Sequence, residues 1–223
     1  MCGRFAQYSD IATLQKTFQI QDVTCNVTPG YNIAPLQKVL SIIHHNGNRL
    51  GLLRWGLVPA WAQDIAIASK LINARLETLE TKPSFRNAFK RRRCLIPADG
   101  FYEWKATGRH KQPWYFTLRS GGTFAFAGLW ETWKGVKDAA YHSCTIITTT
   151  ADDAMRKIHH RMPVILTADV HTAWLNPENQ DPGQLKAVLA AGQVSGLKQF
   201  PISQHVNSTR NNDPACIKPL EVS

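Results

Sequence analysis

Hydrophobic positions along the chain switch between helical and strand spacing in no regular order. Behind Ser9, which can cap a helix, Ile11, Leu14 and Phe18 recur at helical intervals, and this spacing predicts a first helix from Ser9 to about Gln19. Further helices are predicted over residues 84–92, 152–158, 169–175 and 183–191, the last opened by Pro182 near its first turn.

Apolar runs of strand length, rich in β-branched and aromatic residues, fill much of the rest. Residues 38–45 and 49–58 flank the turn signal Asn46-Gly47-Asn48, which predicts a β-hairpin. Further strands are predicted over residues 94–97, 113–119, 123–130 and 141–149. Strands and helices do not alternate regularly, which favours an α+β fold with a largely antiparallel, barrel-like β core flanked by helices. No repeat or Pro/Gly/Ser linker divides the chain, so we expect one domain over residues 1–223.

Composition points to a globular protein with an affinity for polyanions. Hydrophobic residues make up 43% of the 223 residues, and no apolar stretch is long enough to span a membrane. The 26 Lys and Arg residues outnumber the 16 Asp and Glu residues, and the formal charge is +10. Such a surplus makes nucleic acid the first candidate partner, with a generically basic protein as the alternative.

The cysteines and the N-terminus indicate a cellular compartment rather than an extracellular one. The five cysteines are odd in number and widely separated, with no C-x-x-C pair, which argues against a disulfide framework and a zinc knuckle. The start MCGRFAQYSD has no basic leader followed by an apolar run. We therefore expect a cytoplasmic protein in which at most one cysteine has a chemical role.

Cys2 is the candidate for that role because of its position. Loss of Met1 would leave an α-amine and a thiol on adjacent carbons. An α-amine has a pKa of about 7.7–8.0, against about 10.4 for lysine, so far more of it is nucleophilic near neutral pH. Such a 1,2-aminothiol condenses with an aldehyde to an imine, which the thiol closes to a thiazolidine. Alternatively the thiolate attacks an acyl group with the amine as base, or Cys2 has no function.

Two further stretches place polar side chains where a plain strand is expected. Asn73 and Arg75 are two residues apart, so in an extended segment both face one way, where the amide can hold a carbonyl or hydroxyl and the guanidinium a phosphate. The plain alternative is an Asn in a turn and a surface Arg. After the Asp99-Gly100 turn signal, Glu103 lies among aromatic residues, where desolvation raises a carboxyl pKa toward acid/base work. A salt-bridge partner is the competing interpretation of Glu103.

Histidines and tryptophans supply the remaining candidates. His159 and His160 lie in a loop constrained by Pro163, where an imidazole is suited to proton transfer. Adjacent histidines do not normally share one metal face and no third ligand is near, so we expect no metal. Exposed Trp61 and Trp104 would be stacking platforms for unpaired bases, although most tryptophans are core residues.

A basic run ends the helix predicted over residues 84–92. Lys90, Arg91, Arg92 and Arg93 follow one another there, which is favourable against the negative end of the helix dipole. The run is interpreted either as a solvated helix end or as phosphate contacts.

Six ordered blocks of the sequence contain most of these candidate residues. The blocks are Met1-Cys2-Gly3-Arg4-Phe5, Tyr31-Asn32-Ile33-Ala34-Pro35, Trp55-Gly56-Leu57-Val58-Pro59, Ile72-Asn73-Ala74-Arg75, Ala98-Asp99-Gly100-Phe101-Tyr102-Glu103-Trp104 and His159-His160-Arg161-Met162-Pro163. Together they resemble the signature blocks of the SOS-response-associated peptidase family, from residue 2 to about 210. Members of this family look like autopeptidases that remove their own initiator methionine and then crosslink to abasic sites in single-stranded DNA.

The resemblance implies a role for each matching residue. Cys2 would be the nucleophile that forms the thiazolidine, Asn73 its positioning partner, Glu103 the group acting on the amine and the departing methionine, and His159 the acid/base serving the sugar. The residues expected to bind DNA are Arg4, Arg75 and Arg161 at phosphates, Trp61 and Trp104 under flanking bases, and Asn32, Pro35 and Thr148 around the pocket. The crosslink would shield the lesion from strand cleavage by a monomer that needs no cofactor, metal or membrane. A general cysteine peptidase and a non-catalytic single-stranded DNA-binding module are the alternatives.

Overall fold

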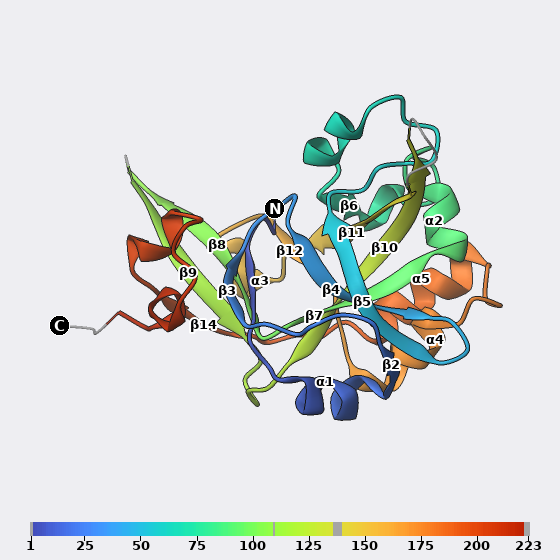
Figure 1. Ribbon diagram of the computed structural model, residues 1–223. Coiled ribbons are helices and arrows are strands. Elements are labelled where there is room, and N and C mark those ends of the chain that lie inside the picture. Colours follow the sequence, from blue (N-terminus) through green and yellow to red (C-terminus); the bar gives the residue numbers. More distant parts are fainter. Residues whose placement is uncertain (1, 109, 136–139, 221–223) are drawn as a thin grey trace.

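A closed ring of five strands forms the centre of the protein. The computed structural model describes residues 2–108, 110–135 and 140–220 (Figure 1). Neighbouring strands pair in the order β11, β10, β7, β4 and β5, and β5 pairs with β11 again, which closes the ring. Their bounds are Ala140–Thr150 for β11, Phe124–Lys134 for β10, Arg93–Ala98 for β7, Lys38–His44 for β4 and Asn48–Trp55 for β5. All of these pairs except β5 with β11 are antiparallel, so the expected α+β fold with an antiparallel, barrel-like core is confirmed.

Short strands extend this barrel at its edges. They are β2 (Ile20–Val23) on β5, β6 (Asn73–Arg75) and β12 (Arg161–Pro163) on β11, and β13 (Ile165–Leu166) on β10. A second sheet has the order β14-β9-β8-β1-β3, with bounds Lys198–Pro201, His110–Thr117, Gly100–Thr107, Phe5–Gln7 and Gly30–Ile33. Figure 1 shows this sheet beside the barrel, with the β8–β9 hairpin projecting from the body.

Helices surround the barrel. They are α1 (Ile11–Phe18), α2 (Arg86–Arg91), α3 (Asp153–Arg156), α4 (His171–Leu175) and α5 (Pro182–Ala191), with 3-10 turns η1 to η5 at Ile65–Lys70, Leu76–Thr78, Ala168–Val170, Gln204–Asn207 and Pro214–Ile217. Figure 1 shows α2, α4 and α5 on the side of the barrel away from the second sheet, whereas α3 lies beside that sheet. The strand and helix predictions are confirmed in type, with ends shifted by a few residues. None of the described helices is long and apolar enough to cross a membrane.

Alternation along the barrel strands produces two cores. On β7, Leu95 packs with the helices, whereas Cys94 and Ile96 pack with the second sheet. On β10, Ala127 and Phe126 divide in the same way. The chain segment before β1 enters the second of these cores, and Cys2 is part of it. The N-terminal end of the chain is therefore fixed at the junction of barrel and sheet.

Two local predictions are corrected by long-range contacts. Asp10 rather than Ser9 caps α1, because the Asp10 carboxylate accepts the Thr13 N–H at 2.7 Å. The Ser9 hydroxyl donates instead to Asp99, 90 residues away, at 2.5 Å. In the basic run, Arg93 is buried and donates to main-chain carbonyls of α2, of α4 and of the segment after α4, including that of Trp174 in α4 at 2.7 Å. Arg93 is thus neither a solvated helix end nor a phosphate contact.

The predicted Asp99-Gly100 turn is the corner where the chain leaves the barrel for the second sheet. The buried Asp99 carboxylate accepts the N–H groups of Tyr8 at 2.5 Å and Ser9 at 2.8 Å, which ties the end of β1 to β8. A Cβ at Gly100 would lie 2.1 Å from the Tyr115 ring, so only glycine fits this close approach.

Gly100→Ala is accordingly expected to destabilise the protein. The added methyl group must displace the buried Tyr115 ring, and overpacking of this kind costs about 1–3 kcal/mol. For a chain of this size the midpoint of thermal unfolding should fall by roughly 3–10 °C. Differential scanning calorimetry of both proteins measures the shift, and an unchanged midpoint would contradict the steric argument.

Candidate active site

Cys2 lies before strand β1 and is completely buried. It packs in the hydrophobic cluster that also contains Phe5 and Trp55. Burial, together with the negative charge of Glu103, raises the pKa of the Cys2 thiol well above its ordinary value. The thiol is therefore protonated at neutral pH, and its sulfur becomes an effective nucleophile where a neighbouring group takes the proton as the bond forms.

Glu103 is the carboxyl group nearest to this chemistry. It comes from the middle of β8 and shares a strand face with Phe101, as alternation along the sequence predicts. Its side chain is buried, and this desolvation raises the pKa of Glu103. A carboxyl group with a raised pKa exchanges protons near neutral pH more readily than an ordinary glutamate.

His159 follows α3 in the loop that leads to β12. Its Nδ1 lies 3.0 Å from the backbone N–H of Arg161 and 3.2 Å from the backbone oxygen of the same residue. The main chain therefore supports either tautomer, so the Nε2 side of the ring can accept or release a proton. Partial burial lowers the pKa of His159, which keeps the imidazole neutral at neutral pH. His160 stacks on it, with ring centroids 4.4 Å apart.

Asn73 begins strand β6, which pairs in parallel with β11 through Ile146. Its Nδ2 donates to the backbone oxygen of Ile72 at 3.0 Å, and the same oxygen accepts the Trp55 indole N–H at 2.9 Å. Its Oδ1 is buried and finds no hydrogen-bond partner among the described residues. Ile72 packs against the cluster that holds Cys2, and a buried acceptor of this kind is suited to a donor from a reacting group.

Arg4 and Trp104 form the rim of the site. The Arg4 guanidinium lies 5.7 Å from the Trp104 ring centroid and donates from Nη1 to Asn32 Oδ1 at 2.6 Å and to the Val206 backbone oxygen at 2.9 Å. Asn32 is buried, and its Nδ2 donates to three backbone oxygens in residues 206–211. Asn32 therefore holds the Arg4 guanidinium and residues 206–211 in position.

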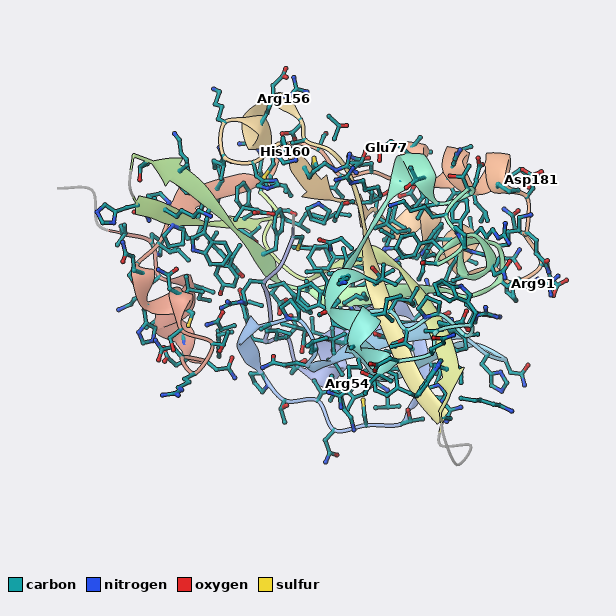
Figure 2. All side chains as sticks on the ribbon, turned by 90° about the horizontal axis from the view of Figure 1, so that it is seen from above. Arg54, Glu77, Arg91, Arg156, His160 and Asp181 are labelled. Carbon is teal, nitrogen blue, oxygen red and sulfur yellow. The ribbon has the colours of Figure 1, made fainter. Side chains whose placement is uncertain are left out.

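Arg161 is engaged by a residue that the sequence did not single out. Its guanidinium forms a two-bond ion pair with the Glu77 carboxylate, at 2.7 and 3.0 Å, and donates from Nη2 to the backbone oxygen of the buried Thr148 at 2.7 Å. Glu77 is labelled in Figure 2, which views the molecule from above. Glu77 lies in the 3-10 turn η2 directly after β6, and no sequence motif marks it.

An open cleft of about 490 Å³ lies at this rim. It is lined by Arg4, Glu103, Trp104, Lys111, His159 and Asn207. The structure thus brings together residues from the N-terminus, the β8–β9 hairpin, the loop after α3 and η4. Lys111 and Asn207 were missed by the sequence analysis. Asn207 has no motif of its own, and its Oδ1 accepts the Trp104 indole N–H at 2.8 Å.

Eight of the twelve predicted site residues lie outside the lining of this cleft: Cys2, Asn73, Asn32 and Arg161, described above, and Trp61, Arg75, Pro35 and Thr148. Trp61 is 58% exposed and lines a different cavity of about 390 Å³ with Lys70. Arg75 is exposed at the end of β6, Pro35 is half-buried after β3, and Thr148 is buried under Arg161. Met1, whose removal the sequence predicts, lies outside the described residues.

One group of metal-ligand types occurs in the described part of the chain, beside the rim. Ligand atoms of His205, Asp213 and Cys216 lie within 4.8 Å of one another. Both ring nitrogens of His205 have hydrogen-bond partners, Asp213 Oδ2 at 3.0 Å and Asn211 Nδ2 at 3.2 Å. These bonds stabilise the turn that presents Asn207 and the Val206 carbonyl.

The fold and the site define an α+β protein with a buried cysteine at position 2 beside a carboxyl group, and with a cleft that this carboxyl group lines together with an imidazole, a cation and an indole. The family model described as SOS response associated peptidase (SRAP) matches residues 1–209, and the chain belongs to this family.

Several known proteins are similar to this chain in sequence or in fold. The chain is 45% identical to abasic site processing protein YoqW of Bacillus subtilis over 98% of this chain and 99% of that protein. It is 32% identical to abasic site processing protein HMCES of Gallus gallus, over 76% of this chain and 57% of that protein. A crystal structure of a Bacteroides thetaiotaomicron protein superposes with a TM-score of 0.87 at 23% identity, covering 99% of this chain and 100% of that one, which supports the fold.

Proposed function

We propose that this protein recognises abasic sites in single-stranded DNA and traps the sugar aldehyde covalently through Cys2, which shields the lesion from strand cleavage. The observation that carries the proposal is the burial of Cys2 beside Glu103, with His159 lining the cleft above. The names of the relatives, abasic site processing proteins, support the same substrate. In this proposal the chain acts as one cytoplasmic domain over residues 1–223, as a monomer and without a cofactor.

The first step is hydrolysis of the peptide bond between Met1 and Cys2. Water adds its hydroxyl to the methionine carbonyl, the C–N bond breaks, and the Cys2 nitrogen leaves as an amine. Glu103, whose pKa burial raises, donates the proton that the departing nitrogen needs, and its carboxylate takes up the proton that water loses. The protein is its own substrate in this step and acts as an autopeptidase.

The second step opens the sugar, because an abasic deoxyribose is mostly a closed hemiacetal. His159 takes the proton of the anomeric hydroxyl as the ring C–O bond breaks, and the ring oxygen is protonated in turn. The aldehyde formed is then open to attack by the Cys2 amine. Neutral His159 is required, and its lowered pKa keeps it neutral under physiological conditions.

Ring closure completes the trap. The amine adds to the aldehyde carbon, and loss of one water gives an imine. The Cys2 sulfur then bonds to that carbon, and the thiol proton moves to the ring nitrogen of the thiazolidine. Asn73 Oδ1, a buried acceptor, holds the amine N–H during this sequence. Arg4, Arg75 and Arg161 bind phosphates, and Trp61 and Trp104 support neighbouring bases, each stack being worth about 1–3 kcal/mol.

Intact-protein mass spectrometry tests the whole proposal. The purified protein should lack Met1, and incubation with a single-stranded abasic oligonucleotide should add the oligonucleotide mass less one water. An undamaged oligonucleotide should add nothing. Turnover of added peptides with indifference to DNA would instead support a general cysteine peptidase, and retained Met1 with equal binding of both oligonucleotides would support a non-catalytic module.

His159→Ala should slow the crosslink roughly 100-fold, because sugar opening loses its acid/base. A matched substrate separates this role from general damage: a small open-chain aldehyde needs no ring opening and should react with variant and wild type at equal rates. Since burial lowers the pKa of His159, the wild-type advantage over the variant should persist at pH 6.5 and disappear at lower pH. If the variant is slowed equally with both substrates, His159 has no specific role in opening of the sugar ring.

A further inference from the structure

Lys111 lies in the cleft but has no role in the chemistry described above. It belongs to β9, where it pairs with Ala106 of β8, and Trp104 pairs with Pro113. Paired residues of antiparallel strands point to the same side, as do residues two apart, so Lys111 and Trp104 share one face of the hairpin. Both line the same cleft.

Arg4, directly before β1, continues this face across the next strand. The β1–β8 pairing places Phe5 opposite Phe101, and the Tyr102 N–H donates to the Arg4 backbone oxygen at 3.0 Å. The Arg4 side chain is therefore on the Trp104 face, in agreement with its position 5.7 Å from the indole centroid. Across β1, β8 and β9, with neighbouring strands about 4.8 Å apart, the order is cation, indole, cation.

The first two members of this row are held in place. Trp104 is fixed by Asn207, and Arg4 is fixed by Asn32 and the Val206 carbonyl. Lys111 is exposed, and within residues 2–108, 110–135 and 140–220 no carboxylate forms an ion pair with it. Its ammonium group is thus available to an anion at the mouth of the cleft.

We propose that Lys111 is a fourth cation of the DNA site, besides Arg4, Arg75 and Arg161, and that it binds the backbone phosphate of the nucleotide whose base contacts Trp104. The inference rests on the proposed function. A base on the indole has a cation on each side, so Arg4 and Lys111 bind the phosphates that flank it. Arg75 and Arg161, on β6 and β12, belong to the other wall of the site, so Lys111 extends the track to nucleotides on one side of the lesion only.

The experiment compares Lys111→Gln with Lys105→Gln. The control removes the same charge from the same hairpin, but Lys105 pairs with Gln112, alternates with Trp104 and lies outside the cleft lining. Binding is measured by fluorescence anisotropy on a single-stranded oligonucleotide with a tetrahydrofuran abasic analogue, which has no aldehyde. Across a salt titration, Lys111→Gln should lower the slope of log K against log[salt] by about 0.7, equivalent to about fivefold in affinity per tenfold change in salt. Lys105→Gln should leave the slope unchanged, and Lys111→Arg should retain it.

Oligonucleotides truncated on either side of the lesion complete the test. The effect of Lys111→Gln should vanish when nucleotides are missing from one side and persist when they are missing from the other. Equal slopes for Lys111→Gln and Lys105→Gln, or an effect that survives both truncations, would overturn the assignment. Crosslinking of the wild type to a true abasic oligonucleotide is run in parallel: its absence refutes the proposed function, whereas its presence with an unaltered Lys111→Gln slope refutes the role of Lys111 alone.

Discussion

Cys2→Ala is expected to abolish the denaturation-resistant adduct with abasic single-stranded DNA. Alanine retains an α-amine once Met1 is removed, so an imine with the aldehyde still forms, but without sulfur no thiazolidine closes. The imine hydrolyses during denaturation, and no shifted band should remain on a denaturing gel. Borohydride added before denaturation should reduce the imine and restore a band, which shows that the amine and the cleft are intact.

Cys94→Ala is the matched control for the lost thiol. Cys94 is equally buried in the same hydrophobic cluster as Cys2, so both variants remove one sulfur from one core. Cys94→Ala should crosslink like the wild type, even where its thermal midpoint falls. An adduct that resists denaturation in Cys2→Ala without borohydride would assign the covalent bond to another residue.

The strand pattern and the faces of β8 could be predicted from the sequence because both depend on local periodicity. Alternation along an extended strand is sufficient to put Phe101 and Glu103 on one side of β8 and Trp104 on the other, as the strand register has them. The Asn46-Gly47 turn is equally local, since positive φ angles of 52° and 119° suit these two residues. The prediction that Ser9 caps α1 was wrong because the Ser9 hydroxyl donates to Asp99, a residue distant in sequence.

The partners of the site residues could not be predicted for the same reason. Arg161 was identified as a phosphate ligand, but its ion pair with Glu77 joins residues 84 apart. Asn32 was placed at the pocket, but its amide binds backbone oxygens more than 170 residues later in the chain. Lys111 has no motif, and it enters the site because the register of two strands sets it beside Trp104. Motifs identify the reactive groups, whereas tertiary contacts decide how each is held.

The desolvation of Glu103 leads to the last large effect. Burial raises the pKa of Glu103 and lowers that of His159, so the two pKa values lie closer together than in water, and Glu103 holds a proton more readily than an ordinary glutamate. An amide in place of the carboxyl group keeps the shape but has no proton to give. Glu103→Gln should therefore slow release of Met1 roughly 1000-fold, and the purified variant should retain the methionine mass.

Retention of Met1 also predicts the state of the crosslink in Glu103→Gln. While Met1 remains, the Cys2 nitrogen is an amide, which does not condense with an aldehyde, so the variant should form no adduct. Removal of Met1 in vitro with a methionine aminopeptidase should restore adduct formation, because sulfur, amine and His159 are unchanged. Intact mass before and after this treatment, followed by a denaturing gel with abasic DNA, separates the two roles. If Glu103→Gln loses Met1 as fast as the wild type in a cell-free synthesis without aminopeptidase, the carboxyl group is not the proton donor in methionine release.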